Sequence, residues 1–550
     1  MTDLTDRTSR WREQDPDPDT IAFLDDLVAR AGAGDPAART ELDEAFAGPL
    51  TFGTAGLRGP LGAGPGRMNR VVVSQAAAGF ARWLVENGHG GGTVIVGYDA
   101  RYKSAEFARD TAEIFAGAGF RAILVAEPTP TPVVVYGIRH FGCVAGVVVT
   151  ASHNPPQDNG YKVYLGDGSQ IVPPVDGEIA SQIAEVARET VKLLPRSSDY
   201  RVLGDELVAA YVAHAAALVP PDAPREVRWV YTAMHGVGAR VLERVAAAAG
   251  FPAPIVVAEQ HEPDPEFPTV AFPNPEERGA IDLALALAER ERADLVVAND
   301  PDADRCAAAA VIGGGWRMLT GDELGAVFAD DALLRRVDGV FACSVVSSTL
   351  LSRMAAAHDR PFVTTLTGFK WIGRVPGLGY GYEEAIGYCC DPGAVPDKDG
   401  ITAALLLLAL TARLRAGGHT IADLLDEIAR TYGLHATAQL SVRVQDLALI
   451  TDAMARLRAR PPQTLGGLPV VVTDLVGGTP TLPPTDAVEL SGPAVHVVAR
   501  PSGTEPKLKC YLEVRLTPEE SREIETARAT AAARLARLRS EMAAALGVEG

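Results

Sequence analysis

The chain has 550 residues, 47% hydrophobic and 22% charged, enough to bury several hydrophobic cores and to form roughly three to five domains. Its formal net charge of -19 argues against a general nucleic-acid binder or a binder of anionic membranes, because both need a basic excess. An anionic small substrate stays compatible with this charge if cations converge on one pocket.

The sequence predicts a cytoplasmic protein with reduced thiols. Residues 1–15 are polar and charged, unlike a secretory signal or a membrane anchor. The longest apolar run, residues 401–414, is shorter than the roughly 20 residues of a spanning helix and predicts a buried helix. The cysteines show no C-x-x-C spacing and no secretory context, so we expect free thiols at Cys143, Cys306, Cys343, Cys389, Cys390 and Cys510.

A helical pattern over residues 19–47 predicts an N-terminal arm. The next stretch, residues 50–66, is too glycine-rich for a helix or a regular strand and contains a single cation, Arg58. In such a loop, backbone N–H groups and one guanidinium can approach an anion closely. A plain surface loop is the alternative interpretation.

Helices then alternate with apolar strands, as is typical of a parallel, doubly wound sheet. The first strand runs into Tyr98-Asp99-Ala100-Arg101, and Arg101 adds a second cation to this part of the chain. The expected elements are helix 74–86, strand 93–97, helix 105–118, strands 122–125 and 145–149, and helices 175–191 and 206–217.

The stretch T-A-S-H-N-P-P-Q-D-N-G-Y-K-V-Y begins where the buried-type strand 145–149 ends. In open α/β sheets, ligands collect at that edge. Ser152 is therefore a candidate nucleophile, with His153 and, on the returning strand, Lys162 as candidate proton handlers. The alternative is a turn in which Ser and Asn side chains cap backbone groups and Lys162 is a solvated surface lysine.

After a Pro-rich linker at residues 219–224 the alternation restarts. The expected elements are strand 227–231, helix 239–249, helix 281–291 and strand 295–298. The Pro-rich passage 262–278 is too long for an ordinary connection, so we expect it to line something.

Strand 295–298 leads into a loop with aspartates at a spacing of two, Asp300, Asp302 and Asp304. An extended backbone would place all three carboxylates on one side, where like charges need a cation. Hard oxygen ligands with room for a phosphate oxygen suit Mg²⁺. A calcium loop of the EF-hand type is excluded, because Arg305 stands where Gly is required and Val311 where Glu is required.

A third α/β unit starts near residue 340, with strand 341–346, loops 364–370 and 381–398, and the helix from residue 401. The acidic pair Glu383-Glu384 lies on a glycine-flanked loop and could accept hydrogen bonds from sugar hydroxyls; a plain exposed loop is the alternative. Mutual repulsion within a cation cluster would lower the pKa of a lysine toward that of a useful base. The cations that we expect to form a positive well are Arg58, Arg101, Lys162, Arg305, Lys370, Lys398 and Arg500.

From residue 438 the pattern changes to alternating strands and a final charged helix, 519–546, which predicts a smaller α+β domain. Here R-P-S-G-T offers a bidentate guanidinium, hydroxyls and a turn for a phosphate dianion: Arg500, Ser502, Gly503 and Thr504. A capped surface turn is the alternative. Two separate anion-binding features would be explained by a substrate with two phosphates, or with one phosphate at either end in turn.

We therefore expect a helical arm at residues 1–50, three related doubly wound α/β domains and a smaller C-terminal α+β domain. The expected boundaries are 51–222 for the serine-loop domain, 223–335 for the aspartate-loop domain, 336–437 for the third α/β domain and 438–550 for the last domain.

With these motifs in hand, the chain resembles the α-D-phosphohexomutase family, the phosphoglucomutases and phosphomannomutases. T-A-S-H-N-P is similar to the phosphoserine loop of the family, D-P-D-A-D-R to its magnesium loop, E-E-A-I-G to its sugar-recognition loop and R-P-S-G-T-E-P to its phosphate-binding loop. The resemblance implies four domains around a central cleft. It also implies that Ser152 is phosphorylated, that a phosphoserine oxygen completes the metal shell, and that Glu383 and Thr367 contact the sugar.

The implied reaction is reversible intramolecular phosphoryl transfer. Phosphorylated Ser152 would give its phosphoryl group to a sugar hydroxyl, and the resulting sugar 1,6-bisphosphate would turn over and return the other phosphate. Lys162 or Lys398 would handle the hydroxyl proton, and the loop at Arg500 would hold the phosphate that does not react. The implied partner is thus a small sugar phosphate, without nucleic acid or membrane; the oligomeric state is not readable from the sequence.

Two departures leave the sugar open. Ala385 stands where hexose-specific relatives often carry Ser, and Gly387 where some carry His, while the following D-K-D-G is most similar to the branch of second-type phosphoglucomutases and phosphopentomutases. A pentose phosphate is therefore an alternative to glucose or mannose phosphate. The alternatives of another class are a magnesium-dependent phosphatase and a non-catalytic sugar-phosphate sensor.

Overall fold

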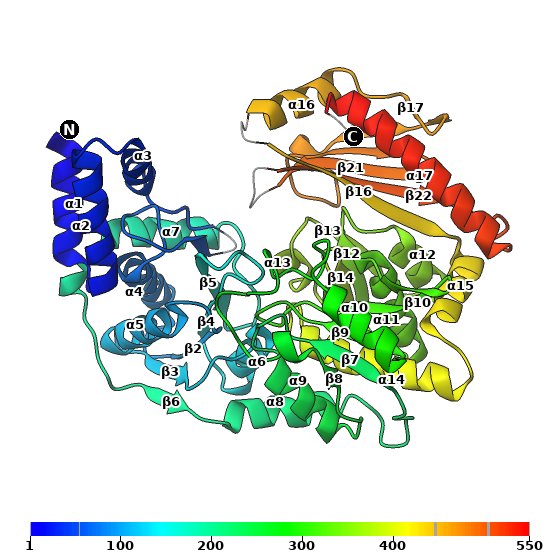
Figure 1. Ribbon diagram of the computed structural model, residues 1–550, viewed down its shortest axis with the longest axis horizontal. Coiled ribbons are helices and arrows are strands. Elements are labelled where there is room, and N and C mark those ends of the chain that lie inside the picture. The colour runs from blue at the N-terminus through cyan, green and yellow to red at the C-terminus, as the bar shows by residue number, and fades with distance from the viewer. Residues whose placement is uncertain (1, 54–55, 445–447, 503–506, 549–550) are drawn as a thin grey trace. The chain divides into compact units, whose positions relative to one another are not determined.

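The computed structural model describes residues 2–53, 56–444, 448–502 and 507–548 (Figure 1). The chain divides into two compact units, Met1–Ala307 with Gly393–Ala409, and Ala308–Pro392 with Leu410–Gly550.

The N-terminal arm consists of three helices, α1 (Thr2–Gln14), α2 (Pro18–Gly32) and α3 (Pro36–Ala45). Helices α2 and α3 each begin with Asp-Pro: the side chains of Asp17 and Asp35 accept hydrogen bonds from the first turn, where proline is tolerated. The pattern over residues 19–47 predicted this region but not α1, whose residues are mostly polar. Lys103 ties the arm to the adjoining domain through ion pairs of 2.9 Å with Asp17 and Asp19.

The first sheet of the first unit has the order β1-β5-β4-β2-β3-β6. Strands β2, β3, β4 and β6 are parallel, whereas β5 runs antiparallel to both β4 and β1. Helices α4 and α7 lie side by side in Figure 1. The elements are β1 (Leu57–Pro60), α4 (Arg70–Glu86), β2 (Thr93–Tyr98), α5 (Ser104–Gly117), β3 (Arg121–Val125), α6 (Thr131–His140), β4 (Ala145–Val149), β5 (Asp158–Leu165), α7 (Val175–Val186), η1 (Val191–Leu193), β6 (Arg201–Leu203) and α8 (Glu206–Ala216).

The same unit contains a second parallel group of strands, in which β7 pairs with β8 and β9. Both β7 and β9 are fully buried and apolar or aromatic apart from one Thr, as expected for strands covered on both faces. The elements are β7 (Trp229–Thr232), α9 (Ala239–Ala248), β8 (Ile255–Val256), η2 (Ala258–Gln260), α10 (Asp282–Glu291) and β9 (Leu295–Ala298). Strand β10 (Ala307–Ile312) leads into the second unit, where it forms a hairpin with β11 (Gly315–Met318).

In the second unit, β12 is parallel to β13 and β14, and β15 returns antiparallel to β14. Gly325 on α11 allows close packing, because a Cβ there would lie 2.6 Å from the ring of Tyr382. The elements are α11 (Gly321–Leu334), β12 (Val340–Ser344), α12 (Leu350–Ala357), β13 (Phe362–Thr365), α13 (Phe369–Ile372), β14 (Leu378–Glu383), β15 (Gly387–Cys389), α14 (Gly400–Ala416), which starts in the first unit, and α15 (Ile421–Tyr432).

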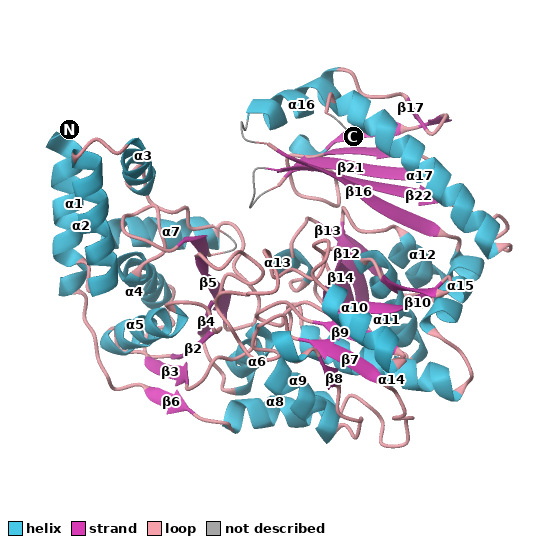
Figure 2. Cartoon of the chain, viewed as in Figure 1, coloured by secondary structure: helices cyan, strands magenta, loops and turns pink. Residues whose placement is uncertain are grey.

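The rest of this unit is an antiparallel sheet of order β16-β22-β21-β20-β19 with α17 along β16 and β22 (Figure 2). Helix α17 begins at residue 524 instead of the expected 519, because residues 518–523 form turns. The elements are β16 (His435–Arg443), α16 (Ala448–Ala459), β17 (Thr464–Leu465), β18 (Leu468–Pro469), β19 (Val471–Asp474), η3 (Leu475–Gly477), β20 (Val488–Ser491), β21 (Val495–Pro501), β22 (Lys507–Arg515) and α17 (Ile524–Leu546).

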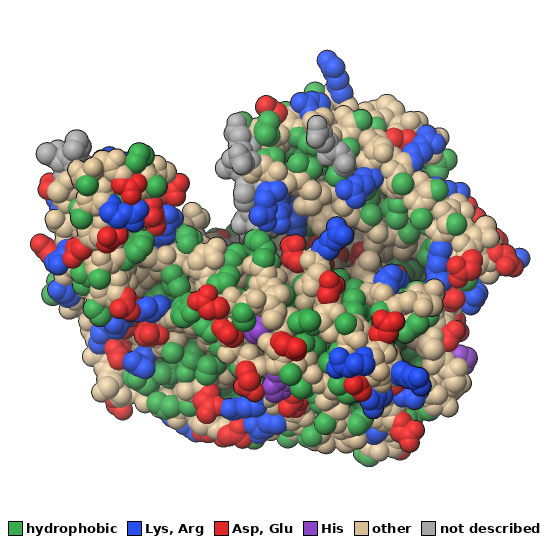
Figure 3. Space-filling model, in the orientation of Figure 1, with side chains coloured by type: hydrophobic (Ala, Val, Ile, Leu, Met, Phe, Trp, Pro, Cys, Tyr) green, Lys and Arg blue, Asp and Glu red, His purple; other side chains and the backbone are tan. Residues whose placement is uncertain are grey.

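The observed elements confirm the predicted fold class of α/β domains followed by an α+β domain. All the cysteines are buried free thiols, as expected. Within the described residues no single helix has the length and apolar character needed to cross a membrane. Acidic and basic side chains are interspersed on the face shown in Figure 3.

Candidate active site

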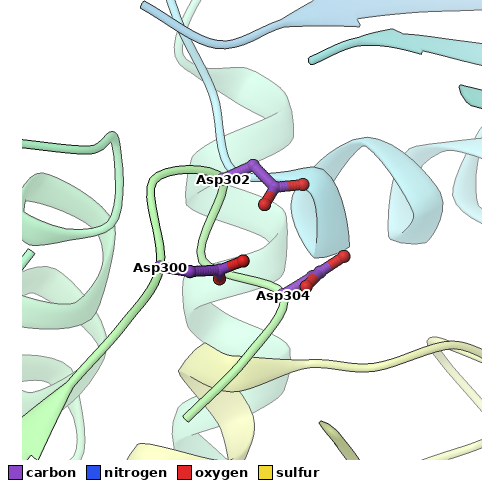
Figure 4. Close-up of side chains that lie close together, drawn as sticks. All are labelled: Asp300, Asp302 and Asp304. Carbon is purple, nitrogen blue, oxygen red and sulfur yellow. The ribbon is translucent and has the colours of Figure 1, made fainter. Parts of the chain in front are cut away.

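Three buried aspartates follow strand β9 in a tight loop of the first unit. Asp300, Asp302 and Asp304 are at most 1% exposed, and a set of their carboxylate oxygens lies within 4.8 Å of one another. Figure 4 shows the three side chains reaching to the same side of the loop. The prediction of convergence is confirmed, but the expected extended backbone is wrong. The loop turns instead, with Ala303 at φ +54° and its N–H bonded to the carbonyl of Asp300 at 2.8 Å.

Asn299, the residue before the three aspartates, holds the aspartate loop through two side-chain hydrogen bonds. Its side chain accepts a hydrogen bond from Tyr231 Oη at 2.9 Å and donates one to the carbonyl of Arg305 at 2.6 Å. The bond to Arg305 joins the two ends of the loop, and the bond from Tyr231 anchors Asn299 to β7.

The carboxylates form a site that fits a hard cation. Burial, together with Asp302 and Asp304, raises the pKa of Asp300 to about 8. One oxygen each of Asp302 and Asp304 is buried with no hydrogen-bond partner. Burial also opposes ionisation of Asp304, but Lys162, Lys398 and Arg305 outweigh it and lower its pKa. Crowded carboxylates with buried oxygens that have no hydrogen-bond partner are what a divalent ion such as Mg²⁺ would satisfy.

Ser152 reaches this cluster from the other sheet of the unit. It is 3% exposed, its Oγ donates a hydrogen bond to Asp300 Oδ2 at 2.7 Å, and its Oγ lies 3.1 Å from His153 Nδ1. Burial and the nearby Arg305 and Arg58 lower the pKa of His153 well below its usual value. The serine and the aspartates, 148 positions apart, therefore form one site, as the two motifs predicted.

Lysines 162 and 398 face the aspartates. Lys162 lies on β5, opposite Val148 of β4, and its Nζ is 2.6 Å from Asp302 Oδ2 and 2.7 Å from Asp304 Oδ2. Burial disfavours its charge, but Asp302 and Asp304 outweigh burial and raise the pKa of Lys162. The expectation that repulsion lowers a lysine pKa is therefore wrong for Lys162. Lys398 Nζ lies 3.5 Å from Asp304 Oδ2.

Sequence reasoning missed several polar residues that hold these groups. Thr131, at the start of α6, donates from Oγ1 to Asp302 Oδ2 at 2.6 Å. Asp397 accepts hydrogen bonds of 2.9 Å from Tyr164 and Gln170 and one of 2.8 Å from the N–H of Lys398. Two features of the sequence could have drawn attention to these residues: Thr131 lies between prolines, and Asp397 lies in the motif D-K-D-G. Neither feature indicates which residue each side chain would contact.

The arginines of the first unit differ in their surroundings. Arg58 on β1 donates to Asn154 Oδ1 at 3.1 Å, and Arg305 Nε lies 3.9 Å from Asp300 Oδ2, so both flank the serine loop. Arg101 is 5% exposed, and its terminal N–H groups donate to main-chain carbonyls of the serine loop. Its expected role as a substrate contact stays a prediction.

The remaining predicted residues lie in the second unit. Thr367 precedes α13, and Lys370 lies in that one-turn helix, where a loop was expected. Glu383 is the buried last residue of β14, again where a loop was expected. Arg500 lies on β21, and the N–H of Ser502 donates to the carbonyl of Lys507 at 2.8 Å. Gly503 and Thr504 lie outside the described residues.

Comparison with protein families accounts for most of the chain. Models of the phosphoglucomutase/phosphomannomutase domains match in order: α/β/α domain I at residues 49–190, domain II at 209–311, domain III at 320–432 and the C-terminal domain at 440–531. The chain belongs to this family. The resemblance seen in the sequence is confirmed, and with it the class of enzyme, a phosphosugar mutase, which is an isomerase.

Three curated relatives illustrate the range of names among similar proteins. A protein of Haemophilus influenzae named "Probable phosphomannomutase" is 48% identical over 459 residues, 82% of this chain and 93% of that protein. Phosphopentomutase of Mus musculus is 34% identical over 583 residues, 94% of this chain and 91% of that protein. Phosphoglucomutase of Staphylococcus aureus is 29% identical over 506 residues, 86% of this chain and 91% of that protein.

A solved structure shows the same fold. It is a phosphoglucomutase/phosphomannomutase family protein of Burkholderia thailandensis, with a TM-score of 0.70 at 20% identity, covering 90% of this chain and 97% of that chain.

Proposed function

We propose that this protein moves a phosphoryl group reversibly between the C1 hydroxyl and the terminal hydroxyl of a sugar phosphate, through phosphorylated Ser152 and a sugar bisphosphate. One observation carries the proposal. In a chain of the phosphosugar mutase family, the Ser152 hydroxyl lies 2.7 Å from Asp300 within a buried cluster of three aspartates. A serine beside a cation site is what repeated phosphorylation and dephosphorylation of that serine require.

The residues fit Mg²⁺ as the resident ion. Asp300, Asp302 and Asp304 would hold it, together with an oxygen of the phosphoserine. When bound, the ion supplies positive charge next to the transferring phosphoryl group, whose equatorial oxygens carry negative charge.

The protein side chains would act in two balanced steps. In the first, the bond between phosphorus and Ser152 Oγ breaks, a bond to the sugar hydroxyl oxygen forms, and the hydroxyl proton passes to a base. In the second, the other phosphate of the bisphosphate returns to Ser152 Oγ by the reverse chemistry. The free enzyme is phosphorylated again at the end, so no phosphate is lost. A sugar 1,6-bisphosphate also serves as activator, because it can phosphorylate the free serine.

Three side chains are candidates for the proton transfers, His153, Lys162 and Lys398. His153 has a ring nitrogen 3.1 Å from Ser152 Oγ, which suits a proton donor or acceptor at that oxygen. Lys162 and Lys398 lie against the aspartates, where their charges also neutralise the departing phosphoryl group. Arg58 and Arg305 would add to this neutralisation.

We assign sugar and phosphate recognition to the second unit. Glu383 and Thr367 would contact the hydroxyls and Lys370 the sugar phosphate, while Arg500, Ser502, Gly503 and Thr504 would hold the phosphate that does not react. Glucose and mannose phosphates are the first candidates. Ribose or deoxyribose phosphate is the second, favoured by Ala385, Gly387 and the phosphopentomutase relatives that match 94% of this chain.

The deciding experiment compares glucose, mannose and ribose 1-phosphates, each with Mg²⁺ and a trace of the matching bisphosphate. We expect the 6- or 5-phosphate isomer of at least one sugar to form without net release of inorganic phosphate. Net phosphate release without an isomer would favour a phosphatase instead.

Substitution of Ser152 provides the second arm of this experiment. The intact mass of the wild-type protein should show a phosphorylated fraction that is absent from Ser152→Ala, which should also lose turnover. A Ser152→Ala protein with full activity would remove the phosphoserine from the mechanism. Sugar-phosphate binding by the wild type without any turnover would favour a sensor.

A further inference from the structure

Both main-chain polar groups of Ser152 are linked to one buried carboxylate, that of Asp99. Asp99 Oδ2 accepts a hydrogen bond from Thr150 Oγ1 at 2.6 Å, and this hydroxyl in turn accepts one from the N–H of Ser152 at 2.8 Å. Asp99 Oδ1 accepts from the N–H of Arg101 at 3.0 Å, and Arg101 Nη2 donates to the carbonyl of Ser152 at 2.6 Å. The two routes meet because β2 and β4 are parallel neighbours, so the residues that follow them are adjacent.

The terminal N–H groups of the Arg101 guanidinium are all engaged by main-chain carbonyls, whereas its Nε makes no hydrogen bond. Its Nη2 donates to the carbonyls of Ser152 and Asn154, and its Nη1 to those of Pro155 and Asp158. Its Nε lies 3.3 Å from Asp99 Oδ2. A guanidinium has five N–H donors, and the four terminal ones are directed at the serine loop, which leaves none of them for a substrate phosphate.

An aromatic ring from a distant segment of the chain packs against this guanidinium. Arg101 Cζ lies 4.9 Å from the ring centroid of Phe267, which is 3% exposed. Phe267 belongs to the Pro-rich passage 262–278, for which the sequence indicated a lining role without saying what it lines. Arg101 is therefore enclosed by the ring, the carboxylate of Asp99 and the carbonyls of the serine loop.

We propose that Asp99, Thr150 and Arg101 act as one positioning unit, which holds the main chain of Ser152 so that its Oγ points at Asp300, and that Arg101 does not bind substrate. The proposal rests on the proposed role of Ser152. Ser152 needs such support because its φ is +54°, a conformation that residues with a Cβ seldom adopt. Misplacing a reacting group by about 1 Å can cost about 10²-fold in rate.

The first test uses a matched pair at Thr150. Thr150→Val keeps the shape and removes the hydroxyl, whereas Thr150→Ser keeps the hydroxyl. With a sugar phosphate that the wild type converts, we expect kcat to fall about 10²-fold in Thr150→Val, with KM changed less than about threefold, and to stay near the wild-type value in Thr150→Ser. An equal loss in both variants would overturn the hydroxyl link.

The second test uses Arg101→Lys, which keeps a positive charge but cannot reach four carbonyls. We expect the same split, a large fall in kcat with a small change in KM. A KM raised more than about tenfold with kcat preserved would instead identify Arg101 as a substrate contact. If Arg101→Lys does not fold, the Thr150 pair decides the question.

A third measurement separates this proposal from the proposed function. Hydrogen exchange of residues 150–158, followed by mass spectrometry, should be faster in Thr150→Val and Arg101→Lys than in the wild type, whichever sugar is converted. Unchanged exchange in both would overturn the positioning unit even if the wild type is a mutase. Absence of turnover in the wild type, with faster exchange in the variants, would remove the function and leave the positioning of the loop intact.

Discussion

Lys162 on β5 and Asp302 on the loop after β9 form an ion pair of 2.6 Å, although 140 positions separate them in the chain. The same ammonium lies 2.7 Å from Asp304. Two of the three carboxylates that would hold a metal ion are therefore already paired with a protein cation. The lysine and a metal ion would therefore share these two carboxylates, the lysine at Oδ2 and the ion at the Oδ1 atoms that have no hydrogen-bond partner.

Because the lysine and the ion share two carboxylates, removing the charge of Lys162 should raise the affinity for a metal ion and lower the rate of catalysis. Lys162→Met should bind Mn²⁺ at least about tenfold more tightly than the wild type, because a positive charge next to the ligands is gone. Its kcat should fall by about 10²-fold or more, because a cation beside the phosphoryl group is lost. Calorimetric titration with Mn²⁺ and steady-state kinetics measure the two effects. Lys162→Arg, which keeps the charge, is the control; weaker Mn²⁺ binding by Lys162→Met would contradict this account.

Gly400 should not tolerate a side chain. A Cβ at Gly400 would lie 2.2 Å from the carbonyl of Arg305 and 2.8 Å from that of Ala303, so the aspartate loop and the start of α14 would have to move apart. We expect Gly400→Ala to lower kcat by about 10²-fold through displacement of Asp304 and Lys398. Gly177→Ala is the matched control, because no atom lies within 4 Å of its Cβ and it is helical. Its stability should rise by about 0.5–1 kcal/mol, with activity unchanged. Equal activity of the two variants would show that the loop adapts.

The capping box of α11 makes a measurable contribution to stability. Thr320 Oγ1 accepts a hydrogen bond from the N–H of Glu323 at 3.1 Å, and Glu323 Oε2 accepts one from the N–H of Thr320 at 2.9 Å. Thr320→Ala should cost about 1 kcal/mol, seen as a Tm lower by about 2–4 °C for a cooperative unit of ordinary size. Thr320→Ser should keep the cap and the wild-type Tm. A Tm of Thr320→Ala within error of that of Thr320→Ser would mean that the cap is not stabilising.

Stability in the second unit should fall between pH 5 and pH 8 because of Asp322. Burial, with smaller effects of Glu384 and Glu513, raises its pKa to about 7, although the N–H of Ser348 and the hydroxyl of Tyr382 donate to its carboxylate. In the unfolded chain its pKa is about 3.9, so the folded state binds the extra proton in this range and loses stability as the pH rises toward 7. Glu513, with a pKa of about 2, is ionised throughout the range and adds no slope.

Substitution of Asp322 by asparagine tests this sign. Asp322→Asn retains an oxygen acceptor and has no proton to lose, so its Tm should change less between pH 5 and pH 8 than that of the wild type. Between pH 5 and pH 8 the two proteins should differ in their change of stability by at most about 3 kcal/mol. Parallel pH profiles of Tm for the two proteins would show that Asp322 is ionised in the fold at both values.

Two parts of the site that the sequence predicted lie directly after buried strands. Ser152 and the aspartates each follow a buried strand, which places each motif at the carboxyl edge of its own sheet. The strands belong to different sheets, so the meeting of the two edges did not follow from strand order and was expected from the family resemblance. The contacts of Arg101 could not be predicted from the sequence, because its partners are main-chain carbonyls, which every residue carries. The direction of the pKa shift of Lys162 could not be predicted either, because it depends on the balance between burial and the carboxylates that folding brings close. Glu383 was expected on a loop because of its flanking glycines, but pairing with β15 places it in a strand. Lys370 was also expected on a loop and lies in a single helical turn.

The first compact unit is discontinuous, since Gly393–Ala409 returns to it after the chain has entered the second unit. A fragment ending at residue 307 would contain Ser152 and all three aspartates but would lack Lys398, and Tyr211 would lose its hydrogen-bond acceptor Asp399. Simple truncation to a minimal catalytic half would therefore keep the nucleophile and the acidic cluster. It would remove the residues of 393–409 that contact the acidic cluster and that support α8. Grafting residues 393–409 back through a new linker would be needed to restore those contacts.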